Sequence, residues 1–119
     1  MESSAAVAAL SALAHEGRLA IFRCLVNAGP EGLAAGALAR RVGMAPNTLS
    51  ASLTILSHAG LAQSRRQGRS IIYRAAFGRM TELLGFLLQD CCEGRPEVCA
   101  PLAAIATRAA CCGPSGEVQ

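Results

Sequence analysis

The feature that most constrains the fold is an abrupt change of hydrophobic period at Gly60. Before it, leucines recur at the i, i+4, i+7 spacing of an amphipathic helix: Leu49, Leu53 and Leu56. Pro46 suits the first helical position and Gly60 suits the end of the helix. After it, residues 61–75 predict two short strands around a tight turn at Gln67-Gly68. The chain must therefore place a helix directly before a two-stranded hairpin.

The remainder of the chain predicts more helices. The sequence is 52% hydrophobic but only 3% aromatic, and it is rich in alanine and leucine, which favours helices over a β-sandwich. A first helix is expected around Val7 and Leu10, and a second ends at Gly29-Pro30. Further helices are expected over about 34–42, 77–92 and 101–110. The fold class is thus mainly α with a small β-hairpin.

Helix, turn, helix and basic hairpin, in that order, predict a winged helix-turn-helix that binds DNA. We expect residues 1–92 to form the DNA-binding and dimerisation domain, and residues 93–119 to form a C-terminal loop and a flexible tail. The net charge of +3 is mild, so the placement of charge matters more than its amount. The candidate DNA-binding residues lie on the outer face of the helix and in the hairpin: Asn47, Thr48, Ser50, Ala51, Ser52, Arg65, Arg66 and Arg69.

A plainer interpretation of the same residues stays open. The helix can be an ordinary amphipathic helix with a Ser/Thr surface, and the hairpin arginines, Arg74 among them, can protect an edge strand from aggregation.

Residues 7–92 resemble the ArsR/SmtB family of bacterial metal-responsive repressors. The most telling segments are His15-Glu16-Gly17-Arg18, the Thr48-to-Leu56 frame, Ala59-Gly60-Leu61, and Gly68-Arg69 with Tyr73. The resemblance implies a homodimer on a palindromic operator that is released when an inducer binds. We expect the N- and C-terminal helices to form its interface. The chain departs from the family at Ala45, where a capping Ser is common, and at Ala51-Ser52, where Arg-His is common.

Cysteines cluster at the end of the chain, with five of the six after position 90. Cys91 and Cys92 close the predicted long helix, and a short loop brings Cys99 back, so three sulfurs can converge. Soft sulfur suits arsenic(III), or antimony(III), which takes three thiolates. A branch of the arsenic-responsive repressors resembles the chain here too. Cys111 and Cys112 are auxiliary candidates, so the loop within residues 93–119 is expected to bind the metalloid. The prediction is an arsenite-responsive repressor that leaves DNA when As(III) binds.

Alternatives for the thiols remain. A zinc or cadmium sensor is disfavoured because three thiolates on a divalent ion would leave a negative charge beside Asp90, Glu93 and Glu97. A redox or persulfide sensor of the same fold needs only the vicinal pair and Cys99. A thiol enzyme lacks a Cys-x-x-Cys at a helix N-terminus, so no catalytic residue is assigned. A module that has lost DNA recognition is the last alternative.

The remaining candidates are expected to be structural. Cys24 is expected in the core, and His15 and His58 as caps or surface groups. Uncharged stretches fall short of the ~18 apolar residues of a membrane span, so we expect a cytoplasmic protein without a membrane partner.

Overall fold

The computed structural model describes residues 1–88, which form five helices and three strands. In chain order they are α1 (Ser3–Leu13), α2 (Glu16–Ala28), β1 (Leu33–Ala34), α3 (Ala35–Val42), α4 (Pro46–His58), β2 (Ala62–Gln67), β3 (Ser70–Ala75) and α5 (Phe77–Leu88). The predicted helices at about 34–42 and 46–60 are confirmed, and the long helix is confirmed as far as Leu88. The rest of that helix, the predicted helix over 101–110 and the five C-terminal cysteines lie outside the described residues.

The centre of the molecule is built from apolar stripes on α2 and α4. These stripes are Ile21, Phe22 and Leu25 on α2, and Leu49, Leu53 and Leu56 on α4. Leu38 of α3 and Leu61, before the hairpin, are fully buried beside these stripes. Removing such side chains from water is the main favourable term in folding, so these residues hold the three helices together. Cys24 is half-buried and packs against this core, as expected.

The residues next to each helix end determine where the helix begins or stops. His15 caps α2, because its Nδ1 accepts hydrogen bonds from the backbone N–H groups of Gly17 at 3.1 Å and Arg18 at 3.4 Å. Gly43 ends α3 in the left-handed conformation at φ 69°. At the start of α4, Ala45 gives no side-chain cap and Pro46 occupies the first turn, as the sequence predicts.

The hairpin belongs to a three-stranded antiparallel sheet of order β1-β3-β2. Gln67 pairs with Ser70, so the turn is Gly68-Arg69, one residue later than predicted. The sequence analysis also missed β1, because two residues are too short to show alternation. This strand pairs Leu33 with Tyr73 and so ties the segment before α3 to the wing.

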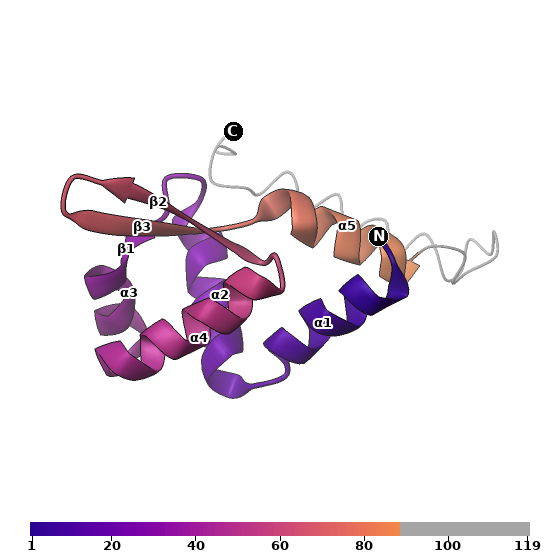
Figure 1. The fold of residues 1–119 in the computed structure, drawn as a ribbon, viewed down its shortest axis with the longest axis horizontal. Coiled ribbons are helices and arrows are strands. Elements are labelled where there is room, and N and C mark those ends of the chain that lie inside the picture. Colours follow the sequence, from indigo (N-terminus) through magenta and orange to yellow (C-terminus); the bar gives the residue numbers. More distant parts are fainter. Residues whose placement is uncertain (89–119) are drawn as a thin grey trace.

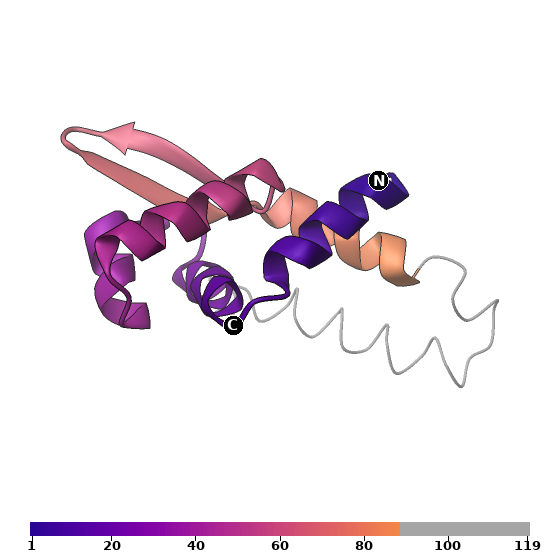
Figure 2. The ribbon, with the colours of Figure 1, turned by 60° about the horizontal axis from the view of Figure 1, so that its bottom comes forward.

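Helices α1 and α5 lie together at the end of the molecule away from the hairpin turn (Figures 1 and 2). The expected first helix is present, but the side it turns inward carries Ala6, Ala9 and Ala12. Val7 is 61% exposed and Leu10 is 41% exposed. On α5 only Leu83 is buried, and Leu84 and Leu87 are both 45% exposed. Within residues 1–88, apolar side chains on both helices are therefore left uncovered.

No single helix among residues 1–88 has the length and apolar character needed to cross a membrane. Helices α1 and α2 pass that test only as a pair, and they are bent by 100° from each other.

Candidate nucleic-acid interface

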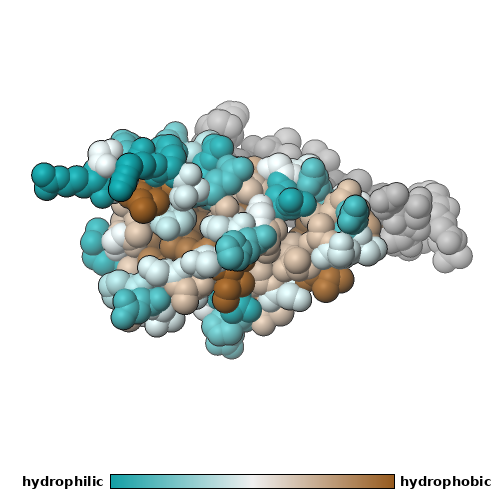
Figure 3. All heavy atoms as spheres, viewed as in Figure 1, coloured by the Kyte–Doolittle hydropathy of each residue, from teal (hydrophilic) through white to brown (hydrophobic). Residues whose placement is uncertain are grey.

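The turn between α3 and α4 and the turn of the hairpin lie at the same end of the molecule (Figure 1). Asn47, Thr48, Ser50 and Ala51 are exposed on α4, as the outer face requires. Figure 3 shows hydrophilic side chains gathered on the hairpin at this end. A helix with small polar residues on its exposed side can approach the edges of bases in a major groove about 12 Å wide.

Ser52 is not part of this outer face. It is 7% exposed, the one buried polar residue in the described part of the chain. Its position explains the burial, because it lies three residues after Leu49 and four before Leu56 and so falls in the apolar stripe. Thr54 is exposed, but its hydroxyl donates to the Ser50 carbonyl at 3.0 Å, so this donor is already used within the helix.

The N-terminus of α4 offers backbone donors to a ligand. Ala45 has no side-chain acceptor for the first-turn amides, and Pro46 has no N–H of its own. The N–H groups of Asn47 and Thr48 therefore point out of the helix end, where the helix dipole favours an anion. A DNA phosphate is the anion that this end of the molecule would meet.

The hairpin register divides the wing arginines between two faces. Arg65 opposes Ile72, and its guanidinium donates to the Glu31 carbonyl at 3.2 Å. Arg74 opposes Gln63 and donates to its Oε1 at 3.0 Å. Side chains alternate along a strand, so Arg65, Gln63 and Arg74 share one face of the hairpin. These two arginines are engaged within the protein.

Arg66 lies on the other face of the hairpin, together with Ala62 of the same strand. Ala62 is buried in the helical core, so this is the face that looks toward the helices. Arg69 lies in the turn itself. Within residues 1–88 neither Arg66 nor Arg69 makes a hydrogen bond or ion pair, so both guanidinium groups are free for phosphates.

Two further basic residues were missed in the sequence analysis. Arg40 and Arg41 occupy the last turn of α3 and are exposed, immediately before the turn into α4. They add positive charge to the same end of the molecule as the hairpin turn, and they also favour the helix C-terminus of α3. The adjacent Arg-Arg pair before Gly43 was the available signal.

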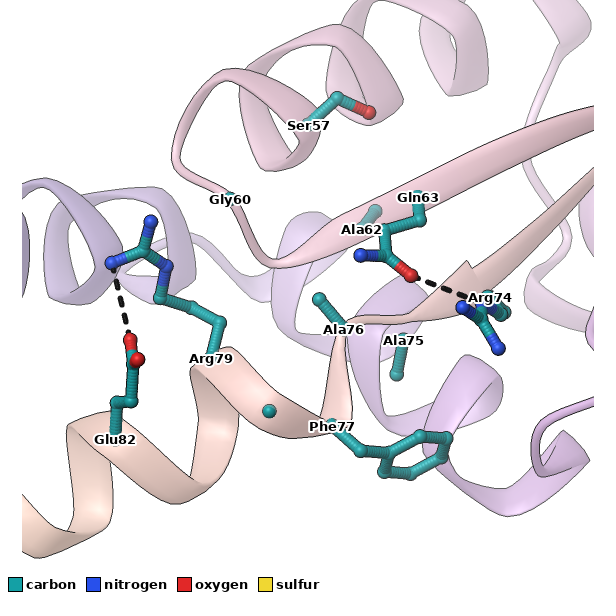
Figure 4. Close-up of a pocket in the computed structure, with 11 residues that line it drawn as sticks. Ser57, Gly60, Ala62, Gln63, Arg74, Ala75, Ala76, Phe77, Arg79 and Glu82 are labelled. Atoms are coloured by element: carbon teal, nitrogen blue, oxygen red, sulfur yellow. Dashed lines mark hydrogen bonds and ion pairs between the residues drawn. The ribbon is translucent and has the colours of Figure 1, made fainter.

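A polar hollow of about 700 Å³ lies at the base of the wing, between the end of α4 and the start of α5 (Figure 4). Its charged groups pair with neighbours: Arg74 with Gln63, and Arg79 with Glu82 at 3.5 Å. Among the described residues no group of three or more His, Cys, Asp or Glu side chains is arranged to hold a metal. The predicted thiol ligands, Cys91, Cys92 and Cys99, and the auxiliary Cys111 and Cys112, lie outside those residues.

Comparison with known proteins agrees with this arrangement. Residues 13–65 match a family model described as a helix-turn-helix domain. Over 78 residues the chain is 37% identical to the nodulation protein NolR of Rhizobium meliloti. The matched region covers 66% of this chain and 62% of that protein. The chain thus spans less than two thirds of the length of this relative.

Solved structures extend the match. The crystal structure of NolR from Sinorhizobium fredii superposes with a TM-score of 0.58 at 34% identity, over 71% of this chain and 82% of that one. A homodimeric winged helix-turn-helix DNA-binding domain from Mycobacterium bovis, a possible ArsR-family transcriptional regulator, gives a TM-score of 0.58 at 30% identity, over 73% and 81%. The chain therefore belongs to the ArsR family of winged helix-turn-helix transcriptional regulators.

Proposed function

We propose that the protein is an arsenite-responsive repressor: a homodimer that binds a palindromic operator in the cytoplasm and releases it when As(III) joins the thiols of Cys91, Cys92 and Cys99. Antimony(III), with the same preference for three thiolates, is expected to act in the same way. The observation that carries the proposal is the run of cysteines just beyond α5, a helix that leaves apolar side chains uncovered.

The exposed apolar residues of α1 and α5 support dimerisation. Val7, Leu10, Leu84 and Leu87 are each at least 41% exposed in the single chain. Covering them against a second copy would bury apolar surface on both partners. A two-fold dimer presents two α4 helices, which fit half-sites about 34 Å apart on DNA. The similar domain from Mycobacterium bovis is a homodimer, which agrees with this proposal.

The one cysteine of the described region does not compete for the ligand role. Cys24 lies in α2 and packs against the core, so a metalloid bound there would disrupt the centre of the domain. Cys91 follows Leu88, the last residue of α5, by three positions. A ligand held at Cys91 would therefore act next to the proposed dimer interface.

Charge favours arsenic(III) over a divalent metal. Arsenite arrives as a neutral hydroxide, and three thiols displace its three hydroxides as water, so the product is neutral. Asp90, Glu93 and Glu97 surround the cysteines in the sequence, and Arg95 is the one basic residue among them. Release of DNA would then come from a changed dimer geometry and not from added charge. A coupling free energy of about 1–3 kcal/mol per site is the usual scale.

The test is a DNA-binding titration with arsenite. The probe is a palindromic duplex selected by the wild-type protein from a random pool, and the variants are Cys91→Ser, Cys92→Ser and Cys99→Ser. Wild type should release the duplex, and each variant should need at least about tenfold more arsenite. Cys24→Ser is the matched control and should respond as wild type does. If all three variants still release DNA like wild type, the assigned site is wrong.

Parallel titrations distinguish the alternatives. Release by peroxide or polysulfide, but not by arsenite, would indicate a redox or persulfide sensor. Release by zinc or cadmium alone would indicate a divalent-metal sensor.

A further inference from the structure

The joint between α1 and α2 is held by two side chains. The helices meet at an angle of 100°, and only Ala14 and His15 separate them. His15 caps the start of α2, as described above. Arg18, in the first turn of α2, reaches back across the joint to the end of α1.

The interaction made by Arg18 is specific. Its Nε donates to the Ala12 carbonyl at 2.6 Å, and its Nη2 donates to the Ser11 carbonyl at 3.3 Å. Both oxygens belong to the last turn of α1. The Ser11 carbonyl also accepts from the Ala14 N–H at 3.2 Å, whereas no backbone N–H within residues 1–88 donates to the Ala12 carbonyl. That turn carries no basic residue of its own, so the Arg18 guanidinium supplies the positive charge that a helix C-terminus favours. The bond to Ala12 is partly buried, which strengthens it relative to one in water.

Helix α1 packs against the rest of the chain mainly through small side chains. The side that it turns inward carries three buried alanines, Ala6, Ala9 and Ala12, each with a small side chain. Of its larger side chains, Val7 and Leu10 are exposed, and Leu13 is partly buried against the core. Small side chains allow α1 to pack closely but bury little area each, so the hydrogen bonds made by Arg18 add a directional restraint at the joint.

We propose that Arg18 is a positioning residue for operator binding. It sets the angle at which α1 leaves the DNA-binding unit and thereby sets the separation of the two α4 helices in the dimer. Arg18 does not contact DNA in this scheme. The inference rests on the proposed dimer, in which α1 forms part of the interface.

The experiment compares Arg18→Ala and Arg18→Lys with Arg23→Ala. Arg23 is an exposed residue of α2 with no side-chain hydrogen bond or ion pair within residues 1–88. Arg23→Ala therefore removes the same charge as Arg18→Ala without removing a contact at the joint. Binding is measured by fluorescence anisotropy to the selected palindrome and to a duplex with one half-site, over a series of salt concentrations. Thermal melting shows that each variant is folded.

Arg18→Ala should weaken binding to the palindrome by at least about tenfold and leave half-site binding and the salt slope unchanged. The palindrome affinity of Arg18→Lys should lie between those of wild type and Arg18→Ala, because a lysine keeps the charge but cannot donate through two nitrogens in a fixed plane. Arg23→Ala should behave as wild type. A slope reduced by about 0.9 for each arginine removed would show that Arg18 binds a phosphate directly and would overturn the proposal. Equal losses of affinity for the palindrome and the half-site would overturn it as well.

Hydrogen exchange separates this proposal from the proposed function. In Arg18→Ala, the amides of α1 should exchange faster than in wild type, and those of α4 should not change. Unchanged exchange in α1 would contradict a positioning role even if the protein binds DNA. Failure of the wild type to select any duplex would instead refute the proposed function, while the exchange data would still decide the role of Arg18 at the joint.

Discussion

At the scale of single residues, His15 is the clearest case of a side chain that defines a helix end. Replacing it with alanine removes the acceptor for the Gly17 and Arg18 amides. We expect His15→Ala to lower the free energy of unfolding by about 1 kcal/mol, as for other N-cap replacements. Urea denaturation followed by circular dichroism measures it. His58→Ala, at the exposed end of α4, is the control and should change stability by less than about 0.5 kcal/mol.

Alanine substitutions at two glycines with positive φ distinguish the cost of backbone strain from the cost of a steric clash. Gly32 (φ 74°) and Gly43 (φ 69°) are both left-handed, so an alanine costs roughly 1 kcal/mol at either. A Cβ at Gly43 meets open space, whereas one at Gly32 would run into the Tyr73 carbonyl oxygen. Gly32→Ala should therefore lower the urea midpoint clearly more than Gly43→Ala, because β1 must move off β3. Equal losses of stability for the two variants would mean that the pairing of β1 with β3 does not add to the stability of the fold.

At the scale of the element, the wing separates arginines available to DNA from arginines engaged in the fold. Arg66→Ala and Arg69→Ala should each weaken operator binding and reduce the salt slope by about 0.9 for every phosphate that is no longer neutralised. Arg65→Ala should change the slope less, because its guanidinium is bound to the Glu31 carbonyl. Anisotropy titrations between low and moderate salt test this. A larger slope change for Arg65 than for Arg66 would reverse the assignment of the two hairpin faces.

At the scale of the whole molecule, the apolar side chains on α1 and α5 predict obligatory pairing for function. Leu84→Glu should give a folded monomer at protein concentrations where wild type is a dimer, and it should lower palindrome affinity at least about tenfold. Its side chain is 45% exposed in the single chain, so the fold of the monomer should be retained. Sedimentation equilibrium measures the oligomeric state of each variant. Ile71→Glu, of similar exposure on the hairpin, should stay dimeric. A dimeric Leu84→Glu would place the interface elsewhere.

Local patterns predicted most of the described fold. The leucine period set the buried face of α4, and Pro46 and Gly29 marked where helices begin or end. These signals work because helix geometry and backbone sterics act over a few residues. The same reasoning missed β1 and placed the hairpin turn one residue early, because strand register depends on pairing between distant segments.

The candidate DNA-binding surface was predicted only in part. The sequence named the polar face of α4 and the wing arginines, but it included Ser52, which is buried, and omitted Arg40 and Arg41. It could not tell that Arg66 is free and Arg65 is engaged, since their orientation depends on which face of the hairpin packs on the helices. The thiol site remains a prediction from spacing and charge, because its cysteines lie outside the described residues.

The order of helices and hairpin, the helix ends and the cluster of thiols were therefore determined by the sequence itself, because each depends on neighbours within a turn or two. The tertiary structure alone decided which side of α1 faces inward and what Arg18 bonds to. Helical period allowed either the alanines or Val7 and Leu10 to face the core, and only packing against α2, α4 and α5 selected the alanines. Close approach of helices favours small side chains, and that choice leaves the larger ones uncovered.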